Sequence, residues 1–352
     1  MSDNRIPVAI LGATGNVGQR FIQLLQDHPW FRVAELVASE RSAGKKFEDA
    51  TVWRLGDDIP DAVRGLTVQD YNADLQSPLA FSSLPSDVAG DIEGRLAAGG
   101  AAVLSNTATH RMDVDVPLVI PEINPEHLDM IETQKANRGW KGFITTNSNC
   151  STMHLALTLK PLQDAFGLKK VLVTTLQAVS GAGYPGVPSL DMIDNIVPYI
   201  PTEEDKMESE AMKMLGGFAN GTFTGADFVL SAHCNRVPVR DGHTECASVT
   251  LGSDPSVDEV IEAFTSFRGQ PQEMGLPSAP KRPIVVRSED NRPQPALDRD
   301  TENGMASVVG RVRPCPVLGM KYVLLGHNTV RGAAGAGVLN AEMLKEKGLL
   351  NI

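Results

Sequence analysis

The start of the chain runs from a strand through a glycine turn into a helix, and this order constrains the fold more than any other feature. Residues 7–11 form an apolar run typical of a buried strand, and apolar residues recur at helical spacing from Val17 onward. Between them, Gly12, Gly15 and Gly18 are spaced G-x-x-G-x-x-G rather than G-x-G-x-x-G. Such a turn lets backbone N–H groups close on a phosphate at a helix N-terminus. A plain tight turn is the alternative, but the strand–helix context favours a nucleotide site.

Further alternation of strands and helices predicts a doubly wound parallel sheet in the first half of the chain. Strands are expected at 31–38, 80–84 and 101–105, with a helix over 86–98, and the apolar stretch after Arg111 is also expected to be a strand. This arrangement is the α/β class that carries nucleotide sites at the carboxyl ends of its strands.

The loop after the second strand indicates which nucleotide is bound. Ser39, Arg41 and Ser42 are groups suited to a 2′-phosphate, whereas Glu40 is the only acid that can bind a ribose 2′-OH. The loop therefore favours NADP over NAD. A solvated basic loop is the alternative interpretation.

A second unit begins at a cysteine. Residues 142–146 resemble a strand, and an apolar helical segment follows to Leu162. Asn149 is expected to be the N-cap, which places Cys150 in the first helical turn, where the helix dipole favours a thiolate. Burial as a structural residue is the usual fate of a free cysteine, but polar neighbours on both sides argue against it. We interpret Cys150 as a nucleophile of lowered pKa and the first of the four cysteines to be alkylated.

The remainder is rich in strands and predicts a largely antiparallel or mixed sheet with helices on one face, an α+β unit. The expected strands cover 171–179, 227–234, 244–251, 284–286, 306–312 and 322–325, and a helix is expected over 257–267. A last helix over 333–347 is expected to dock on the first unit. The predicted domains are therefore 1–149, joined by the C-terminal segment 331–352, and 150–330.

Two residues with catalytic side chains lie seven positions apart in the segment 234–243. On one uninterrupted strand, Arg236 and His243 would point to opposite faces. Pro238 and the Asp241–Gly242 pair predict that the strand breaks between them, so that both side chains reach one pocket. Alone, His243 is more often a surface or satisfied histidine than a base.

Two further segments are ambiguous by themselves. Residues 180–186 are glycine-rich and allow a backbone to approach a ligand closely, although a simple turn is equally expected. Residues 201–206 open a charged helix, which alone indicates a solvated face.

Composition excludes several classes of protein. The 352 residues carry a net charge of −11, so nucleic acid is an unlikely partner. The four cysteines form no C-x-x-C pair, which argues against structural zinc and favours a reducing compartment. No apolar run is long enough to span a bilayer, and the first residues show no signal-peptide pattern. We expect a cytoplasmic protein with no metal and no membrane partner.

Several motifs together resemble the aspartate-β-semialdehyde dehydrogenase family, in its archaeal and fungal branch. They are Gly-Ala-Thr-Gly-Asn-Val-Gly at 12–18, Ser-Asn-Cys-Ser-Thr at 148–152, Gln177 before a glycine-rich loop, and the Arg236–His243 spacing. The resemblance implies a Rossmann-type NADP-binding domain and an α+β catalytic and dimerisation domain of the glyceraldehyde-3-phosphate dehydrogenase type. It also implies reversible, phosphate-dependent conversion of aspartate semialdehyde to aspartyl phosphate, run reductively towards lysine, threonine and methionine, by a homodimer or homotetramer.

The resemblance also implies roles for individual residues. Cys150 matches the nucleophile that forms a thiohemiacetal and then a thioester, and His243 matches the general acid/base. Gln177 matches the glutamine that orients the substrate, and Arg236 matches the arginine that binds the substrate carboxylate. Further substrate contacts are implied for Glu203 (the amino group), Lys206 and Arg111 (phosphate), and Asn149. Cofactor contacts are implied for Gly12, Thr14, Gly15, Asn16, Val17, Ser39, Arg41, Ser42, Ser83, Ser180, Gly181, Gly183 and Asn328.

Two rival functions deserve comparison. Other reductases of this superfamily, acting on malonyl-CoA or N-acetylglutamyl phosphate, share the cysteine and histidine. An acid at Glu203 argues against malonyl-CoA, which has no amino group. A catalytically silent NADP-binding sensor would have no need of Cys150, Gln177 and His243 together.

Overall fold

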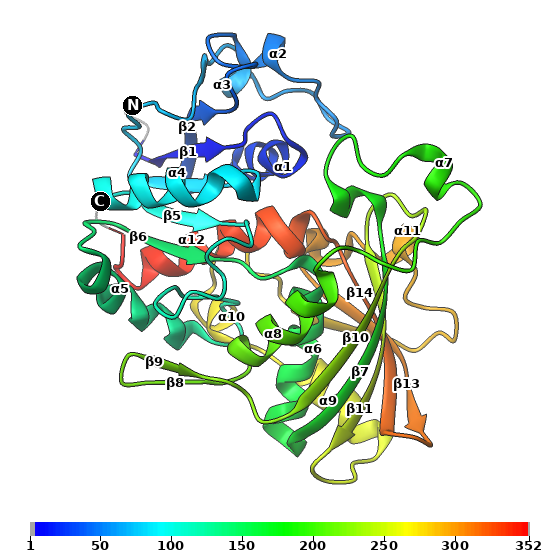
Figure 1. Cartoon of the computed structure of the whole chain (residues 1–352). Coiled ribbons are helices and arrows are strands. Elements are labelled where there is room, and N and C mark those ends of the chain that lie inside the picture. The colour runs from blue at the N-terminus through cyan, green and yellow to red at the C-terminus, as the bar shows by residue number, and fades with distance from the viewer. Residues whose placement is uncertain (1–3, 351–352) are drawn as a thin grey trace.

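The computed structural model describes residues 4–350 and contains two large sheets (Figure 1). The first is parallel, with the strand order β3-β2-β1-β4-β5-β6. Its strands are β1 (Ile6–Leu11), β2 (Phe31–Val37), β3 (Val68–Gln69), β4 (Leu79–Ser82), β5 (Ala102–Ser105) and β6 (Phe143–Thr146). Its helices are α1 (Asn16–Leu25), α2 (Phe47–Ala50), α3 (Asp61–Arg64), α4 (Ser86–Gly99) and α5 (Met130–Arg138). The doubly wound prediction is confirmed, and the order of strands reverses at β1 and β4, where open α/β sheets bind ligands.

The second sheet is mixed, with the order β10-β7-β11-β14-β13-β12, so the prediction of a mixed sheet is also confirmed. Its strands are β7 (Leu168–Gln177), β10 (Val229–Arg236), β11 (His243–Leu251), β12 (Ile284–Arg287), β13 (Ser307–Cys315) and β14 (Gly319–Gly326). A small hairpin, β8 (Gly217–Ala219) and β9 (Thr222–Thr224), projects away from it. The helices of this half are α6 (Cys150–Phe166), α7 (Ser189–Met192), α8 (Glu203–Met214), α9 (Val257–Ser266), α10 (Gln270–Met274) and α11 (Pro295–Asp298).

Helix α6 packs on the inner face of the mixed sheet because almost every one of its side chains is apolar or small. Leu155, Leu159 and Leu162 are fully buried in the core that this sheet shares with α8 and α9. Burial on this scale stabilises a helix by about 1.5–3 kcal/mol for each large side chain. The helix thus holds its first residue, Cys150, in a fixed place at the end of the sheet.

The last helix, α12 (Gly335–Glu346), lies beneath the parallel sheet in Figure 1. Its Leu339 and Met343 are fully buried in the same apolar cluster as Phe21 of α1 and Ile10 of β1. A π-helical turn at 330–334 connects it to β14. The chain therefore crosses from the mixed sheet back to the parallel one just before it ends, and residues 351–352 lie outside the described part.

Some boundaries differ from the sequence predictions. Strand β7 begins at Leu168 and ends at Gln177, and Val179 belongs to a short 3-10 turn because the chain must bend into the glycine loop. The apolar stretch after Arg111, expected to be a strand, forms only one bridge, from Leu118 to Thr146. Within residues 4–350, no helix is long and apolar enough to span a membrane.

Candidate active site

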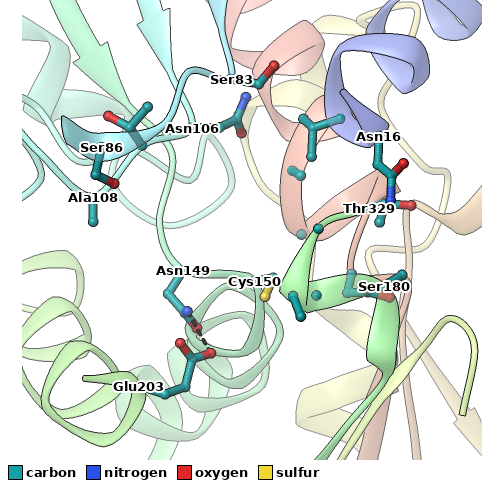
Figure 2. Close-up of a pocket in the computed structure, with 18 of the residues that line it drawn as sticks. Asn16, Ser83, Ser86, Asn106, Ala108, Asn149, Cys150, Ser180, Glu203 and Thr329 are labelled. Carbon is teal, nitrogen blue, oxygen red and sulfur yellow. Dashed lines mark hydrogen bonds between the residues drawn. The ribbon is translucent and has the colours of Figure 1, made fainter. Parts of the chain in front are cut away.

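A cleft of about 750 Å³ lies at the carboxyl ends of the parallel strands, between the two sheets. Figure 2 shows Asn16 and Ser83 on one side of it and Cys150, Asn149 and Glu203 on the other. Fifteen predicted site residues line this cleft: Gly15, Asn16, Val17, Ser83, Arg111, Asn149, Cys150, Gln177, Ser180, Gly181, Gly183, Glu203, Lys206, Arg236 and Asn328. Residues from eight separate segments of the chain thus meet at one place.

The first wall of the cleft is made of backbone. Gly12 has φ +78°, and a Cβ there would lie 2.6 Å from the Ser83 carbonyl oxygen. A Cβ on Gly18 would lie 2.2 Å from the carbonyl oxygen of Gly12, so only glycine allows the turn and helix to pack this closely. Gly15 caps α1 without a side-chain bond, which leaves the first N–H groups of the helix directed at the cleft. A phosphate fits this wall.

The loop after β2 lies outside the cleft lining. Ser39 and Arg41 are exposed, whereas Ser42 is buried and its N–H donates to the Ser39 carbonyl at 2.8 Å. The exposed pair is thus available to a nucleotide that extends beyond the glycine turn. Thr14 lies in that turn, where its carbonyl oxygen accepts a hydrogen bond from Gln19.

The second wall is a row of side chains across three neighbouring strands. Arg236 at the end of β10 pairs in register with Gln177 at the end of β7. The pairing of Thr244 with Leu176 places His243, the first residue of β11, beside Gln177 on the other side. The predicted strand break between Arg236 and His243 is confirmed, since β10 ends at the one and β11 begins at the other. Because β10 and β11 flank β7 on opposite sides, the break carries the chain across the end of β7.

Cys150 and His243 form a pair. The distance from Cys150 Sγ to His243 Nε2 is 3.2 Å. The backbone N–H of Ala178 donates to His243 Nδ1 at 3.0 Å. This bond fixes the ring and leaves Nε2 as the nitrogen that faces the Cys150 thiol. His243 is fully buried, and burial together with the charge of Arg236 lowers its pKa well below that of a free histidine.

The prediction of a lowered cysteine pKa is wrong for this structure. Asn149 does cap α6, accepting hydrogen bonds from the N–H groups of Ser151 and Thr152. However, Cys150 is half-buried, and its polar neighbours Asn149 and Ser151 are buried. Desolvation, with a contribution from the negative charge of Glu203, raises the pKa of Cys150 to about 12 against the opposing effects of Arg111 and Arg236. Without substrate and cofactor, these effects favour the uncharged form of both the thiol and the imidazole.

Arg236 and the glycine loop define the space in front of this pair. Arg236 Nη1 donates to the Ala178 carbonyl at 2.8 Å, which turns the guanidinium toward the catalytic residues. A Cβ on Gly181 would lie 2.8 Å from Arg236 Nη1 and 3.1 Å from His243 Cε1. Gln177 is buried, and its amide donates to the Thr175 hydroxyl at 3.3 Å. Because Gly181 has no side chain, the glycine loop can lie directly against Arg236 and His243.

Helix α8 supplies the opposite side. Glu203 accepts a hydrogen bond from Asn149 Nδ2 at 2.8 Å, drawn as a dashed line in Figure 2. Lys206 lies one turn along the same face and lines the cleft. An acid and a cation thus line the cleft together with the thiol, on a helix whose Met207, Ala211 and Met214 are buried in the core that it shares with α6.

Sequence reasoning missed one acid that organises this side. Glu210 of α8 is 1% exposed and accepts a hydrogen bond from Arg111 Nη1 at 2.9 Å. Its other oxygen accepts from the backbone N–H of Asn149 at 2.6 Å. The available signal was spacing, because Glu203, Lys206 and Glu210 recur at intervals that share one helical face.

Asn328 joins three segments of the site. Its Oδ1 accepts from the Gly242 N–H at 2.9 Å, and its Nδ2 donates to the Ser180 hydroxyl at 2.8 Å. Beyond it, Gly332 approaches Cys150 so closely that a Cβ on Gly332 would lie 2.8 Å from Cys150 Cβ. Among residues 4–350, no three His, Cys, Asp or Glu side chains cluster as a metal site. A glycine turn facing a cysteine–histidine pair across a cleft is the arrangement of a nucleotide-dependent dehydrogenase.

The comparisons with known proteins agree with that class. A semialdehyde dehydrogenase NAD binding domain matches residues 7–131, and a semialdehyde dehydrogenase dimerisation domain matches residues 159–331. The chain belongs to the aspartate-semialdehyde dehydrogenase family. It is 52% identical to the Methanothermobacter thermautotrophicus enzyme and 45% identical to the Saccharomyces cerevisiae enzyme, over 97% of this chain and 99% and 98% of theirs. The predicted resemblance to the archaeal and fungal branch is confirmed.

Solved structures of the family share the whole fold. The crystal structure of the Candida albicans enzyme with NADP matches with a TM-score of 0.90 and 45% identity, covering 98% of this chain and 99% of that one. Aspartate semialdehyde dehydrogenase II of Vibrio cholerae, complexed with ASA, matches with a TM-score of 0.76 and 28% identity over 97% and 98%. The likeness therefore covers both sheets and the cleft between them.

Proposed function

We propose that this chain catalyses the reversible, phosphate-dependent oxidation of L-aspartate-4-semialdehyde to L-aspartyl-4-phosphate with NADP, and that biosynthesis runs it in the reductive direction. The observation that carries the proposal is the 3.2 Å contact between Cys150 Sγ and His243 Nε2, facing the glycine turn across the cleft. The reductive direction supplies the semialdehyde for lysine, threonine and methionine synthesis.

Cys150 forms the bonds to carbon. Its sulfur adds to the aldehyde carbon to give a thiohemiacetal. Loss of hydride and a proton from this adduct gives a thioester, which phosphate cleaves to release aspartyl phosphate and the free thiol. His243 acts at Nε2: as sulfur adds, it gives its proton to the aldehyde oxygen and takes the thiol proton in its place, and it passes on the hydroxyl proton when hydride leaves and the thioester forms. The Ala178 N–H bond to Nδ1 keeps the ring oriented during both steps. A neutral imidazole suits this task because both directions run near neutral pH.

The remaining polar groups match the functional groups of the substrate. Arg236 binds the α-carboxylate with a planar fork, and Glu203 pairs with the α-amino group, which a malonyl thioester lacks. Gln177, between Arg236 and His243, orients the carbonyl. Lys206 and Arg111 hold the phosphate, and Asn149 supports Glu203.

The cofactor site fits NADP, since the crowded turn at Gly12 and Gly18 and the uncapped start of α1 form a cradle that a Cβ would fill. When bound, NADP supplies the hydride acceptor. The cradle residues Gly12, Thr14, Gly15, Asn16 and Val17 would hold the diphosphate. Ser39, Arg41 and Ser42 would hold the 2′-phosphate, and Ser83, Ser180, Gly181, Gly183 and Asn328 would surround the nicotinamide end.

We further propose how the chain is organised and assembled. Residues 1–149 with the C-terminal segment 331–352 form the cofactor domain, and residues 150–330 form the catalytic domain. The matched dimerisation domain supports a homodimer, which is the first assembly to test, with a homotetramer as the larger form. A cytoplasmic location accords with four unpaired cysteines.

A steady-state assay tests the reaction. NADPH formation is measured with aspartate semialdehyde, inorganic phosphate and NADP, and again with each component left out. Turnover should require all three. Equal rates without phosphate, or turnover of malonyl-CoA with NADPH at a comparable rate, would contradict the proposal.

A further inference from the structure

Helix α8 presents a stripe of charged side chains toward the cleft and the loop behind it. Glu203, Lys206, Glu210 and Lys213 are spaced at three, four and three residues, so they share one face. The first two line the cleft, whereas Glu210 and Lys213 are 1% and 7% exposed and lie deeper. Buried charges are costly unless each is paired, so the contacts of the deeper two explain their presence.

Glu210 joins two elements that carry functional groups. One carboxylate oxygen accepts from Arg111 Nη1 at 2.9 Å, and the other accepts from the N–H of Asn149 at 2.6 Å. Asn149 immediately precedes the nucleophile and caps its helix. A single carboxylate therefore connects the proposed phosphate arginine with the start of α6, and among the described residues no other charged side chain contacts both.

The same carboxylate limits how Arg111 can move. Nη1 is bound to Glu210, and Nη2 donates to the Asn106 carbonyl at 2.7 Å. The remaining nitrogen, Nε, is buried without a partner, although Arg111 lines the cleft. With two of its three nitrogens held, the guanidinium presents one fixed edge.

Lys213 holds the backbone that carries this arginine. Its ammonium donates to the carbonyl oxygens of Arg111, Asp113 and Val116, each at 2.8 Å. The loop is thus attached to α8 at two levels, through the arginine side chain and through its main chain. The main-chain attachment keeps the loop in place even when the side-chain contact is changed.

We propose that Glu210 is a positioning residue for phosphate: it fixes the guanidinium of Arg111 at a set distance from Cys150 by bonding Arg111 and the Asn149 N–H with one carboxylate. The proposal rests on the proposed function, which assigns phosphate to Arg111. Glu210 touches neither the substrate nor the thiol. It acts through Arg111.

The test is Glu210→Gln, because a glutamine has one acceptor oxygen in place of two and cannot make both bonds. We expect the KM for phosphate to rise about tenfold, the size of one misplaced charge-assisted contact, with kcat reduced less. Glu210→Asp retains the charge but is one methylene shorter, and should fall between the wild type and Glu210→Gln. Asp205→Asn is the matched control, since Asp205 is an exposed carboxylate on the same helix. It should leave both constants unchanged.

A double-mutant cycle separates positioning from general stability. If Glu210 acts through Arg111, then Glu210→Gln should hardly raise the phosphate KM further in an Arg111→Gln background. Thermal unfolding with and without inorganic phosphate gives a second measure that needs no turnover, and the phosphate-induced rise in Tm should shrink in Glu210→Gln.

Two kinds of result would overturn the role proposed for Glu210. Additive effects in the cycle, or a lower Tm with an unchanged phosphate KM, would make Glu210 a structural residue only. A lower phosphate KM would mean that it merely neutralises Arg111. If the wild type shows no phosphate-dependent turnover, the proposed function fails, whereas the phosphate-induced Tm shift still tests the role of Glu210.

Discussion

The two walls of the cleft are built from different materials. The cofactor wall consists of backbone. Its glycines, Gly12, Gly15 and Gly18, lie within one short segment and allow close packing because they have no side chains. The catalytic wall consists of side chains, such as Cys150 and His243, brought together from α6 and from separate strands. A backbone wall is damaged by adding an atom, whereas a side-chain wall is damaged by removing one. The predictions below test this difference, from the largest expected effect to the smallest.

Removing the nucleophile should have the largest effect. Cys150→Ala leaves no atom to form the thioester, so kcat should fall by about 10⁴-fold or more. NADP should still bind, because the cofactor wall is untouched. Turnover and the NADP-induced shift in Tm measure the two walls separately. Residual turnover within about tenfold of the wild type would show that another residue forms the thioester.

Substitutions of His243 and Arg236, which lie on either side of Gln177, should change different kinetic constants. His243→Ala should lower kcat by about 10²–10⁴-fold, because the proton donor is lost. Arg236→Lys should mainly raise the KM for the semialdehyde, since a lysine cannot reproduce the planar fork. Steady-state kinetics on both variants would reveal the split. If His243→Ala changed only the KM and Arg236→Lys changed only kcat, the roles assigned to the two residues would be wrong.

On the cofactor wall, adding one methyl group should be enough to weaken NADP binding. Gly18→Ala places a Cβ 2.2 Å from the Gly12 carbonyl oxygen. Overpacking of this kind costs about 1–3 kcal/mol, so NADP affinity should weaken by about tenfold to a hundredfold. Gly56→Ala is the control, since nothing lies within 4 Å of its Cβ. Unchanged NADP binding in Gly18→Ala, measured by calorimetry, would show that the turn has room to yield.

The loop beyond the turn should decide between NADP and NAD. Arg41 is exposed, and a charge-assisted contact to a 2′-phosphate is worth about 1.5–3 kcal/mol. Arg41→Ala should therefore lower the preference for NADP by about tenfold or more and leave the kcat/KM for NAD nearly unchanged. Lys141→Ala, which removes an exposed cation elsewhere, is the control. Equal losses with both cofactors would assign Arg41 to the solvated surface.

The smallest expected effect is the order in which the cysteine thiols are alkylated. Burial raises the pKa of Cys150, whereas hydrogen bonds from backbone N–H groups, including that of Leu318, lower the pKa of Cys315. In the unliganded protein, brief iodoacetamide treatment near neutral pH should therefore label Cys315 before Cys150. Labelling of Cys150 should keep rising with pH, about tenfold per unit, without levelling off near neutrality. Peptide mapping gives both rates, and earlier labelling of Cys150 would mean that the helix dipole outweighs desolvation.

Local patterns were sufficient to predict much of the site. The glycine turn, the cap at Asn149 and the break at Pro238 and Gly242 each depend on backbone rules that act within a few residues. The strands were found because their apolar runs are short and regular. The prediction of a strand after Arg111 was wrong. Apolar content does not show whether an adjacent strand has backbone N–H and C=O groups free for pairing, and among the described residues this stretch forms one bridge, from Leu118 to Thr146.

By itself, then, the sequence determined the order of elements, the conformation of the glycine turn and the position of Cys150 at a helix start. Only the tertiary structure decided the surroundings of that cysteine: Glu203 and Glu210 from α8, Arg111 from a distant loop, and His243 from the far side of β7. Helix capping is local and can be read from adjacent residues. Desolvation and charge depend on every group within several ångströms, whatever its place in the chain, and here they reversed the expected pKa of Cys150.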